Sequence, residues 1–236
     1  MISPKMAKLI SCLPEGVVVY IAKKILAGYL DKYADIEVEG LENLKELKKP
    51  VLFICNHLSN SDALVINEVL KDQDLTFVAG IKLSDNPLTN LGIKITKNIT
   101  IKPNTADKEA ISNIVKTLKR GNNVLIFPEG TRSRVGSMIE GKKGVVLIQK
   151  LSKATVIPMA MTGTEKLLPI SEKDMGSEKF QHAKVKVTIG KPIEAPSREE
   201  GEDKHQYEER TLNHFMYGIA ALLPEEYQGV YKLDNR

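Results

Sequence analysis

The sequence predicts an α/β fold, with a mixed, mostly parallel β-sheet layered by helices. Three observations support this prediction. From residue 36 onward, short β-rich runs alternate with stretches in which apolar residues recur at helical spacing. At 236 residues the chain is long enough to bury a sizeable core. Its composition, 42% hydrophobic and 27% charged, is that of an ordinary globular domain.

Residues 1–35 differ from the rest and are interpreted as an N-terminal helical segment in front of a main domain of residues 36–236. Residues 17–22 are continuously apolar, and Lys23 and Lys24 follow them. Two interpretations stay open. The helix lies in a membrane interface with its lysines at the lipid headgroups, or it packs on the core. We expect no membrane span, because no run reaches the ~18 apolar residues that one needs, and no secretory signal.

Six strands and two helices are predicted in the main domain. Each strand is a short β-rich run, and the runs lie at residues 51–55, 76–79, 99–101, 123–127, 155–160 and 184–189. The helices are predicted at residues 63–70 and 106–118, with Gly121 as a plausible stop after the second. The acidic stretch 197–210 is interpreted as a solvated helix start.

Charge and cysteine content limit the class of partner. The formal charge is +4 and aromatic residues make up only 5% of the chain, so a nucleic-acid partner is not expected. A negatively charged substrate or lipid surface remains compatible. Cys12 and Cys55 are too few for a disulfide framework and show no metal-binding spacing, which fits a reducing, intracellular setting. We expect neither a metal ion nor another cofactor.

The stretch NHLSNSD, residues 56–62, joins a predicted buried strand to a predicted helix. Ser and Asn are natural N-caps, so His57 is expected in the turn and Asp62 in the first helical turn. A base and a carboxylate then lie at the carboxyl end of a strand, where open α/β sheets bind ligands. If Asp62 accepts from one imidazole nitrogen, the other can take a proton. The spacing also fits a capping aspartate beside a loop histidine.

A second polar stretch, FPEGTRSR at residues 127–134, directly follows another predicted strand. Pro128 and Gly130 indicate a turn. The planar forks of Arg132 and Arg134 suit phosphate. Glu129 has two interpretations at this point, as an internal ion-pair partner or as an acceptor for a substrate hydroxyl.

Together, NHLSNSD and FPEGTRSR resemble two sequence blocks of the glycerolipid acyltransferases, typified by 1-acyl-sn-glycerol-3-phosphate acyltransferases, and they occur in that family's order. VIPMAM, residues 156–161, resembles the fourth block of the family. Lys142 and Gly144 resemble the Lys-x-Gly that follows its third block. The resemblance covers roughly residues 36–189 and implies a glycerol-phosphate acyltransferase-like fold.

The second block of the family is where this chain departs from the pattern. The family usually shows an Ile-Asp-Arg-like run, whereas residues 91–110 contain no arginine. The distance to the downstream helix favours Lys102 as the counterpart, with Lys97 as second choice. A lysine keeps the positive charge but loses the bidentate fork of arginine.

The resemblance implies transfer of a fatty acyl group from acyl-CoA or acyl-carrier protein to the hydroxyl of a lysophospholipid, foremost 1-acylglycerol-3-phosphate. His57 is then the general base and Asp62 orients it. Arg132 and Lys102 bind the phosphate of the acceptor, and Glu129 binds its glycerol hydroxyl. Substrate binding also involves Gly130, where backbone N–H groups are candidate oxyanion donors, with Thr131 and Lys97 completing the set. The implied location is cytoplasmic, on the inner face of the cell membrane.

Other function classes fit less well. A Walker-like Gly-x4-Gly-Lys at residues 136–143 lacks the Ser or Thr after its lysine that would hold Mg²⁺. A serine hydrolase is disfavoured, because no Gly-x-Ser-x-Gly occurs. The remaining alternative is a catalytically silent lipid- or phosphate-binding protein with the same fold.

Overall fold

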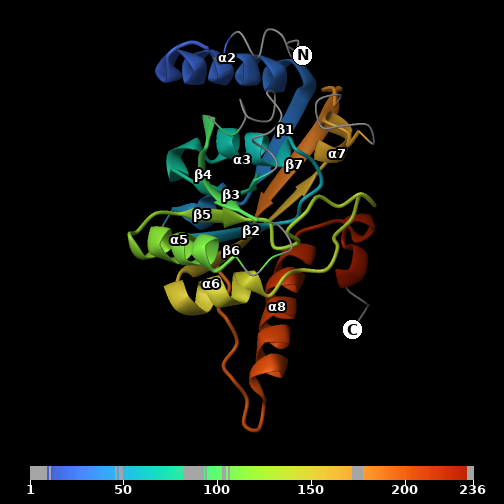
Figure 1. The fold of residues 1–236 in the computed structure, drawn as a ribbon. Coiled ribbons are helices and arrows are strands. Elements are labelled where there is room, and N and C mark those ends of the chain that lie inside the picture. Colours follow the sequence, from blue (N-terminus) through green and yellow to red (C-terminus); the bar gives the residue numbers. More distant parts are fainter. Residues whose placement is uncertain are drawn as a thin grey trace.

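The computed structural model of the protein describes residues 10, 12–45, 47, 50–81, 93, 95–102, 105, 107–171 and 178–232. Seven strands among these residues form one sheet in the order β1-β7-β6-β2-β5-β3-β4 (Figure 1). Strands β6 and β7 pair antiparallel, and the other pairs are parallel. The predicted mixed, mostly parallel α/β sheet is therefore confirmed. The strands are β1 (Ala34–Glu39), β2 (Val51–Cys55), β3 (Thr76–Gly80), β4 (Lys97–Ile101), β5 (Val124–Ile126), β6 (Thr155–Thr162) and β7 (Ala183–Ile189).

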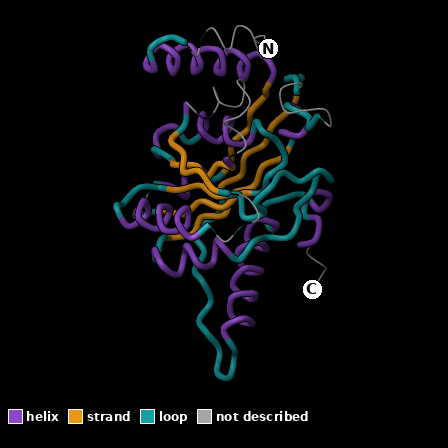
Figure 2. The backbone as a smooth tube through the Cα atoms, in the orientation of Figure 1, coloured by secondary structure: helices purple, strands orange, loops and turns teal. Residues whose placement is uncertain are grey.

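Helices cover both faces of the sheet, so that the orange strands lie between purple layers in Figure 2. One face packs against α5, α6 and α8, and the other against α3, α7 and the end of α2. Alternation along β2 shows the two layers, because Leu52 and Ile54 face the first core while Phe53 faces the second. The helices are α2 (Glu15–Tyr33), α3 (Asp62–Val69), α5 (Lys108–Lys119), α6 (Gly144–Ser152), α7 (Thr164–Leu167) and α8 (Lys204–Ala220).

All six predicted strands are present, the strand at 51–55 with the predicted ends and the other five with shifted ends, but one strand and two α-helices were missed. Strand β1 spans residues 34–39 and so crosses the boundary that the sequence placed between residues 35 and 36. It is an edge strand in which half-buried and exposed residues alternate. Helices α6 and α7 were also not predicted. The acidic stretch does start a helix, since Asp203 and Gln206 form a capping box in front of α8. The predicted helix 106–118 is α5, and Ala106 lies outside the described residues.

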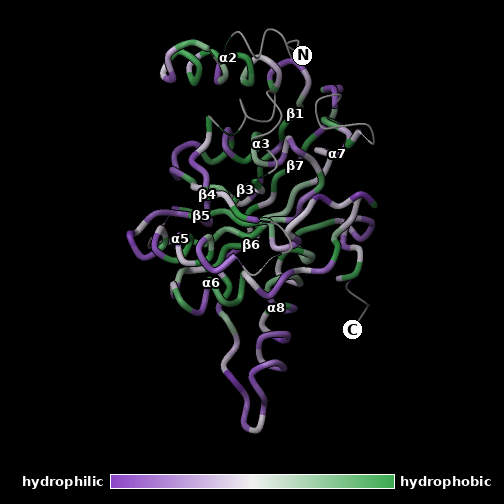
Figure 3. The backbone as a smooth tube through the Cα atoms, viewed as in Figure 1, coloured by the Kyte–Doolittle hydropathy of each residue, from purple (hydrophilic) through white to green (hydrophobic). Residues whose placement is uncertain are grey.

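Helix α2 lies at one end of the molecule and leads directly into β1 (Figure 1). Leu30 near its C-terminus is buried in the second core, the one that contains Phe53. Val18 and Ala22 join a separate small cluster with Ile10 and Ile95. Val17 and Tyr20 of α2 are exposed. Figure 3 shows stretches of hydrophobic residues along the helix in green. No described helix is both long and apolar enough to cross a membrane. Residues 1–9 of the N-terminal segment lie outside the described residues.

Candidate active site

Four parallel strands end at the same edge of the sheet and bring the polar stretches together. Ile54 of β2 lies opposite Ile126 of β5, so His57 and Glu129 follow at matching positions. Gly80 of β3 pairs with Ile101 of β4 and brings Lys102 to the same edge. A cavity of about 700 Å³ lies here, with a mostly apolar lining. The structure therefore builds the site where an α/β sheet is expected to bind a ligand.

His57 and Asp62 form a partly buried hydrogen-bonded pair. The Nδ1 of His57 lies 2.7 Å from Oδ2 of Asp62, which also accepts from the backbone N–H groups of Leu58 (2.7 Å) and Ser59 (2.9 Å). Asp62 is fully buried, whereas His57 is 19% exposed and lines the cavity. The ring of Phe127 stacks on the imidazole at 4.1 Å and 12°. A carboxylate acceptor fixes the proton on Nδ1, which leaves Nε2 able to accept a proton.

Side chains that sequence reasoning had not assigned hold the His57 turn in place. The side chain of Asn56 accepts from the N–H of Met161 and donates to its carbonyl, both at 2.8 Å. This exchange continues the β2–β6 ladder beyond its last backbone pair. The hydroxyl of Ser59 donates to the carbonyl of Leu168 at 2.7 Å. The position of Asn56, directly after a buried strand, was the signal available in the sequence.

Glu129 supports the backbone of the site. One carboxylate oxygen accepts from the N–H of His57 at 2.8 Å and the other from the N–H of Ile139 at 3.0 Å. The side chain is fully buried and is not part of the cavity lining. Burial raises its pKa to about 7, with the charge of Asp62 adding to the effect and the two N–H donors opposing it. The structure thus places Glu129 behind the cavity wall, away from the position expected of a hydroxyl ligand.

Arg132 forms an ion pair with Glu178, a residue that was not predicted from the sequence to belong to the site. Its Nη1 donates to Oε1 of Glu178 at 2.7 Å, and the second oxygen of Glu178 accepts from the side chain of Asn60 at 2.7 Å. Glu178 lines the cavity but Arg132 does not. Of the neighbouring turn, Gly130 has a φ of +71° and lines the cavity, while Thr131 is exposed.

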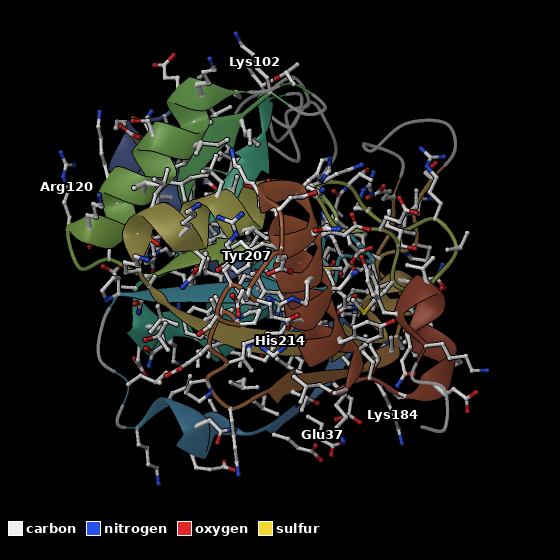
Figure 4. The ribbon with its side chains drawn as sticks, turned by 90° about the horizontal axis from the view of Figure 1, so that it is seen from below. Glu37, Lys102, Arg120, Lys184, Tyr207 and His214 are labelled. Atoms are coloured by element: carbon white, nitrogen blue, oxygen red, sulfur yellow. The ribbon has the colours of Figure 1, made fainter. Side chains whose placement is uncertain are left out.

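The lysines separate into two kinds. Lys102 lines the cavity at the end of β4, whereas Lys97 lies at the start of that strand and pairs with Asp74 at 2.7 Å. In Figure 4, Lys102 lies at one edge of the molecule, with the labelled residues of β1 and β7 at the opposite edge. Lys142 also lines the cavity. Its N–H donates to the carbonyl of Pro128 at 2.7 Å, and it is the neighbouring Lys143 that pairs with Glu209. From the sequence, Lys142 was recognised as part of a Lys-x-Gly pair but was given no role.

Residues 35–162, more than half of the chain, match the sequence profile of the acyltransferase family. The chain belongs to this acyltransferase family. Among the residues that the structure describes, no group of three His, Cys, Asp or Glu side chains could hold a metal ion.

Named relatives of this acyltransferase carry a narrower description. The chain is 28% identical over 177 residues to the chloroplast 1-acyl-sn-glycerol-3-phosphate acyltransferase LPAT1 of Arabidopsis thaliana, covering 74% of this chain and 48% of that protein. It is 27% identical over 158 residues to the 1-acyl-sn-glycerol-3-phosphate acyltransferase of Bacillus subtilis, covering 67% and 73%. The chain thus spans about half the length of the plant relative.

The fold is shared with a solved acyltransferase structure. The crystal structure of the 1-acyl-sn-glycerophosphate acyltransferase PlsC from Thermotoga maritima has a TM-score of 0.63 to this chain. The match covers 92% of this chain and 87% of that one at 23% sequence identity. The match therefore extends beyond the family profile and includes most of the described elements.

The raised pKa of Glu129 predicts a pH-dependent stability. Between its ordinary pKa of 4.5 and about 7, the folded protein holds a proton that the unfolded chain has released. The free energy of unfolding should therefore fall as the pH rises through this window, by about 3 kcal/mol from this group. Glu129→Gln should remove this pH dependence, because an amide does not titrate in this range. Urea unfolding of both proteins from pH 4.5 to 8 checks this. If the free energies of unfolding of the two proteins changed with pH in the same way, the assignment of this pH dependence to Glu129 would be wrong.

Proposed function

We propose that the protein transfers a fatty acyl group from an acyl thioester, acyl-CoA or acyl-carrier protein, to the free hydroxyl of 1-acylglycerol-3-phosphate in phospholipid synthesis. The observation that carries the proposal is the His57–Asp62 pair at the wall of a largely apolar cavity. The apolar lining suits an acyl chain, and the lysines at the same cavity suit a phosphate. The names of the relatives agree with this acceptor.

The geometry supports direct transfer without a covalent enzyme intermediate. Nε2 of His57 takes the proton of the acceptor hydroxyl, whose oxygen attacks the thioester carbonyl. The resulting tetrahedral intermediate collapses as its carbon–sulfur bond breaks, and the departing sulfur takes the proton from His57. Asp62 holds the imidazole through Nδ1. In this proposal the backbone N–H groups around Gly130, which lines the cavity, are the donors for the oxyanion.

The acceptor phosphate is assigned to the lysines of the cavity rim in this proposal. Lys102 and Lys142 arrive from different elements and both line the cavity. Lys142 lies beside Gly130, where a Cβ would make ordinary van der Waals contact with its Cγ at 3.4 Å. Two lysines provide charge without fixed bidentate geometry, which is compatible with several phosphate orientations.

The same proposal includes docking on the inner face of the cell membrane. Leu13, Val17 and Tyr20 on and before α2 expose 42%, 44% and 64% of their surface. Lys23 and Lys24 on the same helix are exposed and suit anionic headgroups. Both the lysophospholipid acceptor and the product are lipids, and acyl thioester donors are made inside cells. A peripheral protein on the cytoplasmic side can reach both substrates.

Thiol release tests the activity directly. Free thiol is followed with a thiol reagent after acyl-CoA or acyl-carrier protein is supplied together with 1-acylglycerol-3-phosphate, and the lipid products are identified by mass spectrometry. We expect release that depends on the acceptor. No acceptor-dependent release with any donor would instead favour a catalytically silent lipid- or phosphate-binding protein.

Substitutions at the pair should affect turnover rather than acceptor binding. His57→Ala removes the base but no phosphate contact, so kcat should fall by about 10²-fold or more with little change in acceptor KM. Asp62→Asn should have a smaller effect on kcat if Asp62 only orients the imidazole. Steady-state kinetics with circular dichroism as a check on folding measures both. A His57→Ala variant with near-normal turnover would refute the mechanism.

The lysines provide matched pairs for testing phosphate binding. Lys102→Ala and Lys142→Ala should each raise the KM for 1-acylglycerol-3-phosphate by about 10-fold, because each removes a charge-assisted contact that exists before the transition state. Lys97→Ala and Lys143→Ala are the controls, since Lys97 pairs with Asp74 and Lys143 lies 2.6 Å from His205. Equal effects in variants and controls would mean that only overall charge matters.

Docking can be tested without removing the buried parts of α2. Val17→Asp combined with Tyr20→Asp places charge on the exposed face of the helix and should abolish co-sedimentation with phosphatidylglycerol vesicles. Thermal unfolding should change little, because both side chains are substantially exposed. Val230→Asp, at a residue with 60% exposure near the other end of the chain, is the control and should still sediment. Retained vesicle binding by the double variant would exclude α2 as the docking element.

A further inference from the structure

In the Arg132–Glu178 ion pair, it is the carboxylate and not the guanidinium that lines the cavity. The side chain of Arg132 is 16% exposed and that of Glu178 only 2%. Yet Glu178 contributes to the cavity lining and Arg132 does not. An anionic ligand that enters the cavity therefore meets a carboxylate in front of the arginine that suits phosphate best.

Glu178 belongs to a short segment that is neither helix nor strand. This segment comprises residues 178–182. Phe180 stacks on the ring of Tyr29 of α2 at 5.2 Å and 5°, and the N–H of Gln181 donates to the carbonyl of Leu167 at 2.8 Å. His182 contacts the ring of Tyr33 at 4.9 Å. The segment that carries Glu178 thus contacts α2 through Phe180 and His182, while Glu178 itself binds Arg132 and Asn60.

We infer that Glu178 occupies Arg132 in the ligand-free protein and that the phosphate of the acceptor replaces it. The inference rests on the proposed function, because it assigns a step in acceptor binding to that site. A carboxylate and a phosphate are both anions that a guanidinium binds with paired hydrogen bonds. Their exchange leaves Arg132 with a counter-charge before and after binding.

The exchange involves Glu178 only when the acceptor is phosphorylated. A neutral acceptor such as 1-acylglycerol offers no anion, so separating the pair for it would leave a largely buried arginine without a counter-charge, which is unfavourable. A phosphorylated acceptor restores the charge balance. Only a phosphorylated acceptor can therefore separate the pair, and its affinity is lowered by the contacts of Glu178 that it must replace.

Two effects of removing the carboxylate act in opposite directions. Loss of Glu178 frees Arg132 from a fixed position, which weakens phosphate binding if the pair only orients the arginine. It also removes the competing anion and a nearby negative charge, which strengthens binding. Because Glu178 lines the cavity and Arg132 does not, competition should be the larger effect.

The test is Glu178→Gln, which keeps the shape and removes the charge. We expect the KM for 1-acylglycerol-3-phosphate to fall by about 10-fold. The gain should disappear in the Arg132→Ala background. A raised KM would show that Glu178 only orients Arg132. A gain that persists without Arg132 would show that its charge acts at a distance. Either result overturns the inference.

Two further measurements keep the test decisive. Phe180→Leu removes the stacking on α2 but keeps an apolar side chain, and it should lower the same KM to a smaller extent, so it replaces Glu178→Gln if that variant does not fold. Calorimetric binding of glycerol 3-phosphate to the wild type and the variants reports the exchange without turnover. Headgroup binding that tightens in Glu178→Gln while no variant transfers acyl groups would refute the proposed function and support the exchange. Glu165→Gln is the control, because Glu165 pairs with Tyr227 outside the cavity. It should change neither the KM for 1-acylglycerol-3-phosphate nor the affinity for glycerol 3-phosphate.

Discussion

One carboxylate oxygen determines the geometry of the site. Oδ2 of Asp62 accepts three hydrogen bonds, from the imidazole of His57 and from the N–H groups of Leu58 and Ser59. A fully buried carboxylate is unfavourable without such donors, so the charge of Asp62 can stay inside only while the loop keeps this shape. The same contact therefore closes the turn, begins α3 and selects the tautomer of His57. Displacing the loop would leave a buried charge unsatisfied.

Neighbouring strands transmit this constraint to the rest of the sheet. Asn56 continues the ladder between β2 and β6, and Glu129 connects the end of β5 to the backbone of His57. Two buried carboxylates then lie close to each other, each compensated largely by backbone N–H groups. A site built from strand ends is held more rigidly than one built from long loops, which suits a base that must meet two substrates at a defined position.

The sequence predicted what depends on local pattern and missed what depends on register. Alternating strands and helices gave the α/β class, and the position of His57 and Asp62 after a buried strand suggested their pairing. Strand β1 was missed because its alternation of charged and apolar residues is short and borders the apolar helix. The function of Glu129 stayed open because only the pairing of β2 with β5 brings it to His57. Likewise, Lys97 and Lys102 separate only because β4 begins at residue 97, two residues earlier than predicted. Glu178 lies more than 40 residues from Arg132, and no local pattern connects them.

The direct passage from α2 into β1 also bears on how this protein would meet lipid. The helix ends at Tyr33 and the strand begins at Ala34, so no linker separates them. If α2 lies on a bilayer, the sheet then has one fixed tilt, and the cavity opens at one height above the membrane plane. An acceptor lipid would reach the cavity by lateral diffusion within the leaflet. Its encounter rate would then depend on its surface density in the membrane rather than on its concentration in bulk solution.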